Sequence, residues 1–371
     1  MPKLTPAAAL PRTPTVEFLF NPSIDLMNAM YFTRLVVDTD GVEGWPVEVR
    51  AEMEPGLLAE LDFLYTFPND QPGVMGQLGD VLFAHPEAWE SIEALVAWVR
   101  NLPLGIGESE ADPGVQGLAF HLCCTVDEPE PPLHDDPREA LRLKIQRDGA
   151  TDIDAKLRLW DRPEELRERM ARLIERFYEE HYKAELPKRR GALERSVAAH
   201  RGATLEQALD LMRKVTGRPA SCLENGICPG PYERTIFSPS LDVGPYSSCI
   251  SFEGRHSVHG MIYALEAEFL GDSAADSSDT QRLARIYKAL GDEQRLRILG
   301  MLRDTEMYAQ EIVERLDLHQ SVVSRHLMLL KAVGLVDVRK QNNMKFFSLN
   351  SDITSELGKT LDLFAGVRKE A

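Results

Sequence analysis

One segment near the C-terminus carries side chains whose types and spacing suit contact with nucleic-acid bases. Val323, Leu327 and Leu330 recur at helical spacing and predict the inward face of a helix over residues 320–333. The polar residues outside this apolar stripe are Gln320, Ser321, Ser324, Arg325, His326 and Lys331. Amide, hydroxyl and guanidinium groups hydrogen-bond to base edges in a DNA groove. The chemistry indicated is recognition of DNA, with a solvated helix face as the alternative. For His326, a phosphate contact and a packed position capping a neighbour both stay open.

A short helix is predicted immediately before this segment. Its apolar face is formed by Ala309, Ile312, Val313 and Leu316. The turn Asp317-Leu318-His319 separates the two helices. A short helix, a three-residue turn and a second helix with a polar outer face form the helix-turn-helix plan, whose second helix enters a major groove.

A β-hairpin is predicted directly after the second helix, which Gly334 ends. Residues 336–340 and 345–349 are its strands, and the tip Gln341-Asn342-Asn343 suits positive φ angles. Three basic residues flank this tip: Arg339, Lys340 and Lys345. A basic hairpin beside a recognition helix is a wing that contacts phosphates or a minor groove, whereas ordinary surface charge is the alternative.

Further helices are predicted on both sides of the motif. The apolar residues of the first are Leu283, Ile286, Tyr287 and Leu290, and those of the second are Leu296, Leu299 and Leu302. Gly291 stops the first and Asp292 is an N-cap for the second. A last helix carries Ile353, Leu357, Leu361 and Phe364 on one stripe. Residues 281–371 therefore form one winged helix-turn-helix domain.

This C-terminal quarter resembles the ArsR/SmtB family of winged-helix repressors. The resemblance is carried by ALGDEQRLRIL, which opens the matching run, and by SVVSRHLMLLKAVGLV in the recognition segment. It implies a dimer built from the first and last helices of the domain. It also implies binding of double-stranded DNA at an inverted-repeat operator, with repression relieved by a signal.

The sequence departs from the metal sensors of that family. They carry a Cys-x-Cys-type motif where this chain has Glu306-Met307-Tyr308-Ala309-Gln310-Glu311, and the last helix, residues 353–364, contains no histidine. We therefore expect no metal at these positions and no cofactor.

The cysteines are five in number, which argues against a disulfide framework. Cys222, Cys228 and Cys249, with His256 and His259 nearby, are candidates for a redox or metal site, although their spacing matches no standard zinc pattern. Buried free cysteine is the alternative. Cys123 and Cys124, beside His121, form a weaker candidate of the same kind.

The charge of the chain is distributed unevenly. Residues 280–371 hold 15 Lys and Arg and 12 Asp and Glu, so that residues 1–279 carry a net charge of −20 within a total of −17. The acidic part would repel DNA, and contact with DNA should therefore fall to the tail domain.

The organisation follows from composition breaks. Residues 271–280 (GDSAADSSDT) are small and polar and predict a linker, and the acidic, proline-rich residues 127–137 suggest a further boundary within residues 1–270. Residues 1–270 have mostly helical periodicity, with an amphipathic helix over 162–182 whose charged face should be solvated and paired at i, i+4.

A small antiparallel sheet is expected in the same region from 234–238, 248–252 and 258–264. The fold class is mainly α (α+β). The segments Phe237–Ser240 and Val243–Tyr246 resemble Pro-Ser and Val-Gly-Pro turns of long regulators of this type.

Three hypotheses about function follow. The first is a dimeric repressor whose N-terminal region senses a small molecule, a protein or another signal. The second is an enzyme with an autoregulatory DNA-binding tail, although GxSxG, GxGxxG, phosphate-loop and HExxH motifs are absent. The third is an interaction protein whose acidic front docks a partner. With no apolar run of about 18 residues, we expect no membrane span and a place in the cytoplasm.

Overall fold

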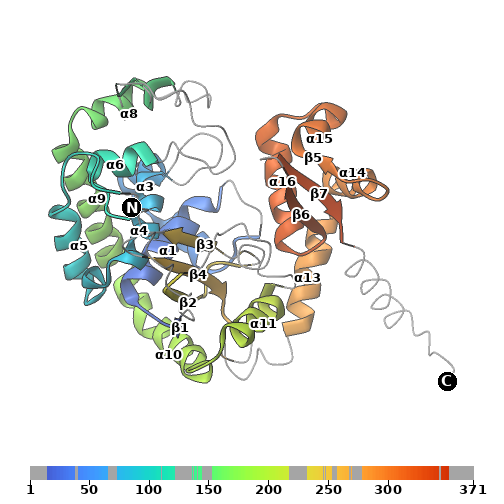
Figure 1. Ribbon diagram of the computed structural model, residues 1–371, viewed down its shortest axis with the longest axis horizontal. Helices are drawn as coiled ribbons and strands as arrows, with labels where there is room; N and C mark the ends of the chain where they lie inside the picture. Colours follow the sequence, from blue (N-terminus) through green and yellow to red (C-terminus); the bar gives the residue numbers. More distant parts are fainter. Residues whose placement is uncertain are drawn as a thin grey trace, which may run out of the picture.

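The computed structural model describes residues 15–37, 41–65, 73–109, 111–121, 136, 138–139, 141–143, 153–216, 232–244, 246, 248–252, 257–266, 269, 278–341 and 344–350. These residues form a helical body, which contains a four-stranded sheet, and a winged-helix domain beside it (Figure 1). The expectation of a mainly helical chain with small sheets is confirmed.

The elements of the body carry the labels of Figure 1. Its helices are α1 (Pro22–Leu35), α2 (Trp45–Glu52), α3 (Pro55–Tyr65), α4 (Val74–Val81), the 3-10 turns η2 (Leu82–Ala84) and η3 (Pro86–Trp89), α5 (Ile92–Arg100), α6 (Val115–His121), α8 (Ile153–Trp160), α9 (Pro163–Phe177), the π-helical turn η4 (Tyr178–Tyr182), α10 (Lys183–Ala199) and α11 (Leu205–Thr216). Its strands are β1 (Thr15–Phe18), β2 (Arg234–Ser240), β3 (Ser248–Phe252) and β4 (Val258–Ala264).

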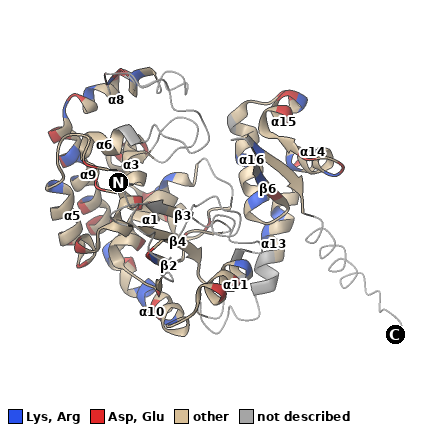
Figure 2. Ribbon diagram, viewed as in Figure 1, with Lys and Arg blue, Asp and Glu red and all other residues tan. Residues whose placement is uncertain are grey.

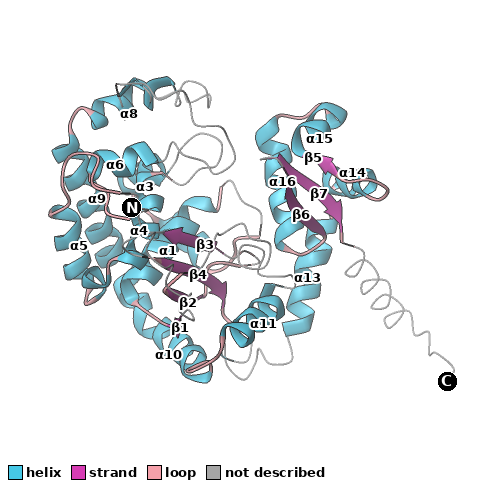
Figure 3. Cartoon of the chain, in the orientation of Figure 1, coloured by secondary structure: helices cyan, strands magenta, loops and turns pink. Residues whose placement is uncertain are grey.

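The sheet of the body is mixed, so the expectation of an antiparallel sheet was wrong for most of its pairings. The strand order is β1-β2-β4-β3, and only β3 and β4 pair antiparallel. Strands β2 and β3 follow each other in sequence but are not paired, because β2 lies between β4 and the distant β1 (Figure 3). Phe237–Ser240 is consequently strand rather than turn. Its Pro239 lies beyond Phe237, the last residue paired with β1, where β2 has a free edge that tolerates proline.

Both faces of this sheet are buried, because successive side chains of β2 and β4 point to opposite faces and nearly all of them are buried. Ile236, Val258 and Ile262 belong to the large core of the helical body. Phe237, Met261 and Tyr263 point to the other face and pack with the apolar face of α11. An added Cβ at Gly260 would lie 2.5 Å from the ring of Phe83, so the strand requires glycine there.

The long helix of the body is continuous from α9 through η4 to α10 and so extends well beyond the amphipathic helix predicted over 162–182. In η4 the amide of Lys183 donates to the carbonyl of Tyr178, five residues earlier. Pro187 then lies within α10, where it removes one backbone donor without ending the helix. Exposed i, i+4 pairs such as Arg172–Glu168 and Arg176–Glu180 confirm the paired, solvated face.

Helix starts in the body follow their capping residues. Asn21 accepts hydrogen bonds from the amides of Ser23 and Ile24 at the start of α1. The helical stretch that begins at Pro86 is divided into η3 and α5, because the Ser91 hydroxyl accepts from the amide of Ala94 and starts α5 anew.

The winged-helix domain has its own core. Its elements are α13 (Ser278–Leu290), α14 (Glu293–Leu302), β5 (Met307–Tyr308), α15 (Ala309–Leu316), α16 (Gln320–Ala332), β6 (Val336–Gln341) and β7 (Met344–Leu349). Helix α13 begins three residues before the domain start that the sequence suggested. On α14, Ile298 and Leu302 are buried, whereas Leu296 is 52% exposed and does not belong to the core. Of the described helices, none is both long and apolar enough to cross a membrane.

Candidate nucleic-acid interface

The helix-turn-helix is formed by α15 and α16, as the sequence predicted. The side chain of Glu311 accepts a hydrogen bond of 3.0 Å from the amide of Tyr308 and fixes the first turn of α15. Asp317 ends α15 in the left-handed conformation, with φ 53° and ψ 44°. Ile312 on α15 and Val323 on α16 are both buried in the core that joins the two helices.

Helix α16 presents a polar face outward. Gln320 and Ser324 are exposed and Lys331 is half-buried, and at 3.6 residues per turn these three lie within about 40° of one another around the helix. Val323, Leu327 and Leu330 face the core. Arg325 is half-buried on the flank of the polar face, and the side chain of Ser321 lies outside the described residues.

Met328 lies within the same outward sector and was missed in the sequence analysis. It is half-buried and follows Ser324 by four residues, so it is aligned with the polar stripe. An apolar side chain there can contact the methyl group of thymine. The four-residue spacing from Ser324 could have identified Met328, but its apolar side chain suggested a position in the core.

His326 lies at the packed boundary between α16 and α14. Its Nδ1 is 4.0 Å from a carboxylate oxygen of Asp292. The same oxygen of Asp292 accepts from the amide of Arg295 at 2.9 Å as the N-cap of α14. Burial alone would raise the pKa of Asp292, but the hydrogen bond from Arg295 and nearby positive charge hold it below its usual value. Of the two roles left open for His326, this geometry favours the packed one.

The wing is formed by β6 and β7, with β5 pairing on the outer side of β7. Arg339 stands opposite Phe346 and Lys340 opposite Lys345 in the ladder. Arg339 makes a two-pronged ion pair with Glu306, and its guanidinium lies 4.8 Å from the centre of the Phe346 ring. Lys345 is exposed, and the side chain of Lys340 lies outside the described residues.

Basic and acidic side chains are interspersed in both parts of the molecule. Figure 2 shows Lys and Arg interspersed with Asp and Glu along the helices of the body. Arg325 on α16 has no salt bridge within the described part of the chain. The winged domain therefore has a cation on the flank of its outward face that is not neutralised by a contacting carboxylate.

Several sequence candidates fall outside the described residues: Cys123, Cys124, Cys222, Cys228, His256 and the whole last helix over 353–364. Cys249 lies on β3, but its side chain is not among those described, nor is that of His121 at the end of α6. His259 is fully buried on β4, 5.3 Å from the ring of Tyr232. Within the described ranges, no group of three His, Cys, Asp or Glu could hold a metal ion.

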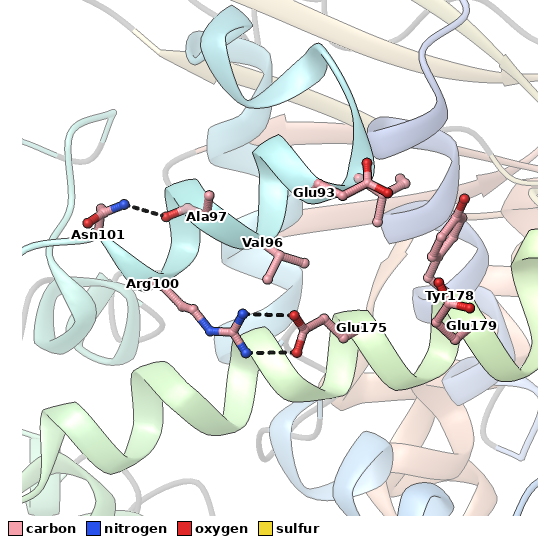
Figure 4. Close-up of a pocket in the computed structure, with 9 residues that line it drawn as sticks. Glu93, Val96, Ala97, Arg100, Asn101, Glu175, Tyr178 and Glu179 are labelled. Atoms are coloured by element: carbon pink, nitrogen blue, oxygen red, sulfur yellow. Dashed lines mark hydrogen bonds and ion pairs between the residues drawn. The ribbon is translucent and has the colours of Figure 1, made fainter.

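A groove of about 500 Å³ lies between α5 and the α9–η4 helix (Figure 4). Ile92, Val96 and Tyr178 form its apolar part. Its Arg100 is bonded to Glu175 by two hydrogen bonds of 2.7 Å, and to Glu168 as well. These opposite charges hold the two helices together, so Glu175 is occupied as an ion-pair partner and does not stand out as a catalytic acid or base.

The fold and the outward face of α16 together define a winged helix-turn-helix domain of a transcriptional regulator. The family model described as "Bacterial regulatory protein, arsR family" matches residues 292–338. An HTH-type transcriptional regulator of Methanocaldococcus jannaschii is 35% identical over 83 residues, which are 22% of this chain and 93% of that protein. The arsenical resistance operon repressor of Staphylococcus xylosus is 31% identical over 83 residues, again 22% of this chain, and 80% of the repressor. The chain belongs to the arsR family of bacterial regulatory proteins.

Another relative is the transcriptional activator HlyU of Vibrio cholerae. It is 44% identical over 66 residues, which are 18% of this chain, and the chain spans 61% of its length. The solved structure of HlyU from this organism aligns at 35% identity over 23% of this chain and 94% of that chain, with a TM-score of 0.21. These matches concern the DNA-binding domain of the chain.

Proposed function

We propose that this protein is a dimeric repressor that binds an inverted-repeat operator through α16 and the wing, and that residues 1–270 receive the signal that controls binding. The observation that carries the proposal is the outward polar face of α16, formed by Gln320, Ser324 and Lys331, with Arg325 on its flank. Relatives named as repressors support the sign of regulation.

We infer different tasks for the residues along the interface. Gln320 and Ser324 lie in the first turns of α16, the part of a recognition helix that reaches base edges. Lys331 lies about 16 Å further along the helix than Gln320, where a phosphate contact is expected. Arg339 must exchange Glu306 for a phosphate before it can contribute, and Lys345 lies exposed on the wing.

The proposal for a dimer rests on the family and on the symmetry of inverted repeats. Two copies related by a two-fold axis present two α16 helices to half-sites one or more helical turns apart. A single copy would recognise only one half-site and bind far more weakly.

The test is a footprint on the region upstream of the gene for this protein, with the salt concentration varied. We expect protection of two half-sites, an affinity that falls steeply with salt, and lower transcription from that promoter when the protein is present. A footprint with raised transcription would overturn the repressor assignment alone. Binding that does not distinguish the upstream region from unrelated DNA would overturn the proposal as a whole.

A further inference from the structure

A cavity of about 360 Å³ lies where the body meets the winged-helix domain. The body contributes the segment after α1, with Val42 and Glu43, and α13 contributes Arg285 and Lys288. The wall on the far side is formed by Leu329 near the C-terminal end of α16 and by Val333 in the turn after it. In Figure 1, α13 lies on the side of the winged domain that faces the body, which places the cavity between the two parts.

Most charged groups of this cavity already have partners. Lys288 forms an ion pair with Glu43 across the boundary between body and winged domain. The guanidinium of Arg295 donates to the carbonyls of Ala289 at 2.6 Å and Lys288 at 3.3 Å. Asp292 accepts from the amide of Arg295.

Arg285 is the exception. Its side chain is half-buried, and among the described residues it makes no hydrogen bond and no ion pair at contact distance. Burial lowers the pKa of Arg285, and the more distant charge of Glu43 opposes this only in part. A guanidinium removed from water and left without an acceptor is unfavourable, because no partner offsets its lost hydration. An anion placed in the cavity would remove this cost.

We propose that this cavity binds a small organic carboxylate, with the carboxylate on Arg285 and the apolar part against Val42, Leu329 and Val333. A guanidinium fork suits a carboxylate because two parallel N–H groups donate to its two oxygens. The cavity volume suits a ligand of modest size. The proposal deepens the proposed function, on which it rests: the bound anion is the signal that residues 1–270 share with the DNA-binding domain.

The position of the cavity provides a route to DNA. Leu329 belongs to α16 and follows Arg325 by one helical turn, and Val333 directly follows the last residue of that helix. A ligand held between Val42 and these two residues fixes the recognition helix relative to the body. It will change affinity for DNA when the DNA-bound arrangement accepts the ligand better or worse than the free one.

The binding test uses the full-length protein with benzoate as probe, and benzyl alcohol as the uncharged analogue of the same shape. Titration calorimetry gives the dissociation constant for wild-type protein and for Arg285→Gln. We expect benzoate binding to weaken about ten- to a hundredfold in Arg285→Gln, as for loss of a charge-assisted hydrogen bond. The matched control is Arg297→Gln, an exposed arginine on α14 outside the cavity, which should bind benzoate like wild type.

A variant that is expected to bind benzoate more tightly gives a result that misfolding cannot explain. Glu43→Gln releases Lys288 as a second cation for the carboxylate, so benzoate should bind several-fold more tightly. Damage to the fold cannot produce this gain. The proposal is overturned if Glu43→Gln binds benzoate no more tightly than wild type, or if Arg285→Gln binds it equally well. It is also overturned if benzyl alcohol binds as tightly as benzoate, or if benzoate does not bind at 10 mM, a concentration on the order of a weak ligand's Kd.

DNA affinity measured on the same samples separates the two proposals. If benzoate binds through Arg285 and shifts the affinity for the upstream DNA, both stand. If the protein gives its footprint but benzoate does not bind, the cavity proposal fails and the proposed function stands. If benzoate binds through Arg285 and no DNA is recognised, the ligand site stands, but its regulatory role and the proposed function fail.

Discussion

Arg189 of the helical body and Arg339 of the winged-helix domain lie in opposite settings. In the body, Arg189 is 1% exposed and lies between two buried carboxylates. In the winged domain, Arg339 is about half exposed, and its carboxylate partner Glu306 is itself partly open to water. The same side chain stabilises a fold in one region and is available for a ligand in the other.

The setting of Arg189 is fully enclosed. It donates to the carboxylate of Asp242 at 2.6 and 2.8 Å and approaches Asp25 at 3.5 Å. The ring of Trp45 lies 4.4 Å from the guanidinium. The hydroxyl of Tyr182 donates to Asp25 at 2.5 Å. This cluster joins α1, η4, α10 and the turn after β2, so we call it the Arg189 cluster.

The difference shows that burial, rather than residue type, decides what a charge does. Inside the Arg189 cluster each charge must be matched, because the surroundings cannot solvate it. At the wing, a charged side chain can exchange one partner for another at a low cost in free energy, because water solvates the charge while it is unpaired. Four substitutions break or sharpen this contrast.

The largest effect is expected for Arg189→Met. This change leaves Asp242 and Asp25 buried without their cation, and we expect the body to lose about 3–5 kcal/mol of unfolding free energy. All four tryptophans lie within residues 1–270, so urea unfolding followed by tryptophan fluorescence reports on the body alone.

The control is Arg190→Met, which removes an exposed arginine from the same helix. It should cost less than about 1 kcal/mol. Equal costs for the two variants would show that burial does not distinguish these arginines, and the contrast between the regions would fail.

The second prediction concerns pH and Asp25. Burial raises the pKa of Asp25 from 3.8 to about 6, against the opposing charge of Arg189. The folded chain therefore binds this proton more tightly than the unfolded chain, and its contribution to stability falls as the pH rises from about 4 to about 6.

The substitution Asp25→Asn removes this titration. The unfolding free energy of wild type minus that of Asp25→Asn should decrease by up to about 3 kcal/mol between pH 4 and pH 6 and then stay level. Tryptophan fluorescence during urea unfolding at each pH gives the two curves. A difference that rises with pH would mean that Asp25 is stabilised as the charged form.

The third prediction moves to the winged domain. Arg325→Ala should weaken binding to the upstream DNA by about 1–3 kcal/mol and relax the sequence preference, if the guanidinium reads a base. Fluorescence anisotropy with specific and scrambled duplexes measures both effects. Arg297→Ala on α14 is the matched control and should bind DNA like wild type. An equal loss on both duplexes would make Arg325 a phosphate contact instead.

The smallest effect is expected for Glu306→Gln. It releases Arg339 for a phosphate, so DNA should bind about two- to fivefold more tightly at low salt, and the salt dependence should become steeper. Glu293→Gln changes the net charge equally at an exposed position away from Arg339. If both variants tighten binding alike, the gain comes from overall charge rather than from the released arginine.

The sequence was most informative about the winged domain, because its signals are local. The apolar positions Val323, Leu327 and Leu330 repeat within one helix. The left-handed Asp317 opens the three-residue turn that separates the two helical patterns. The hairpin lies between its own two strands. Each element contacts its sequence neighbours, so periodicity and turn residues suffice to place Gln320 and Ser324 outward.

The body was harder, because its decisive contacts join distant residues. Nothing in Arg234–Ser240 reveals that β1, more than 200 residues earlier, is its parallel neighbour. The amphipathic pattern of the sequence predicted α9, but nothing in it predicted the π-helical turn that begins at Tyr178. The pairing of Arg189 with Asp25 and Asp242 spans 164 and 53 residues along the chain, and no spacing rule connects them.

The sequence by itself determined the helix-turn-helix, the wing and the outward face of the recognition helix, because side chains three and four residues apart share one face of a helix. Only the tertiary structure decided which charges are occupied. It paired Arg339 with Glu306, enclosed Arg189 between two carboxylates and left Arg285 half-buried with no acceptor among the residues described. Charge pairing depends on distance in space and on access to water, and both are set only when segments far apart in the chain come together.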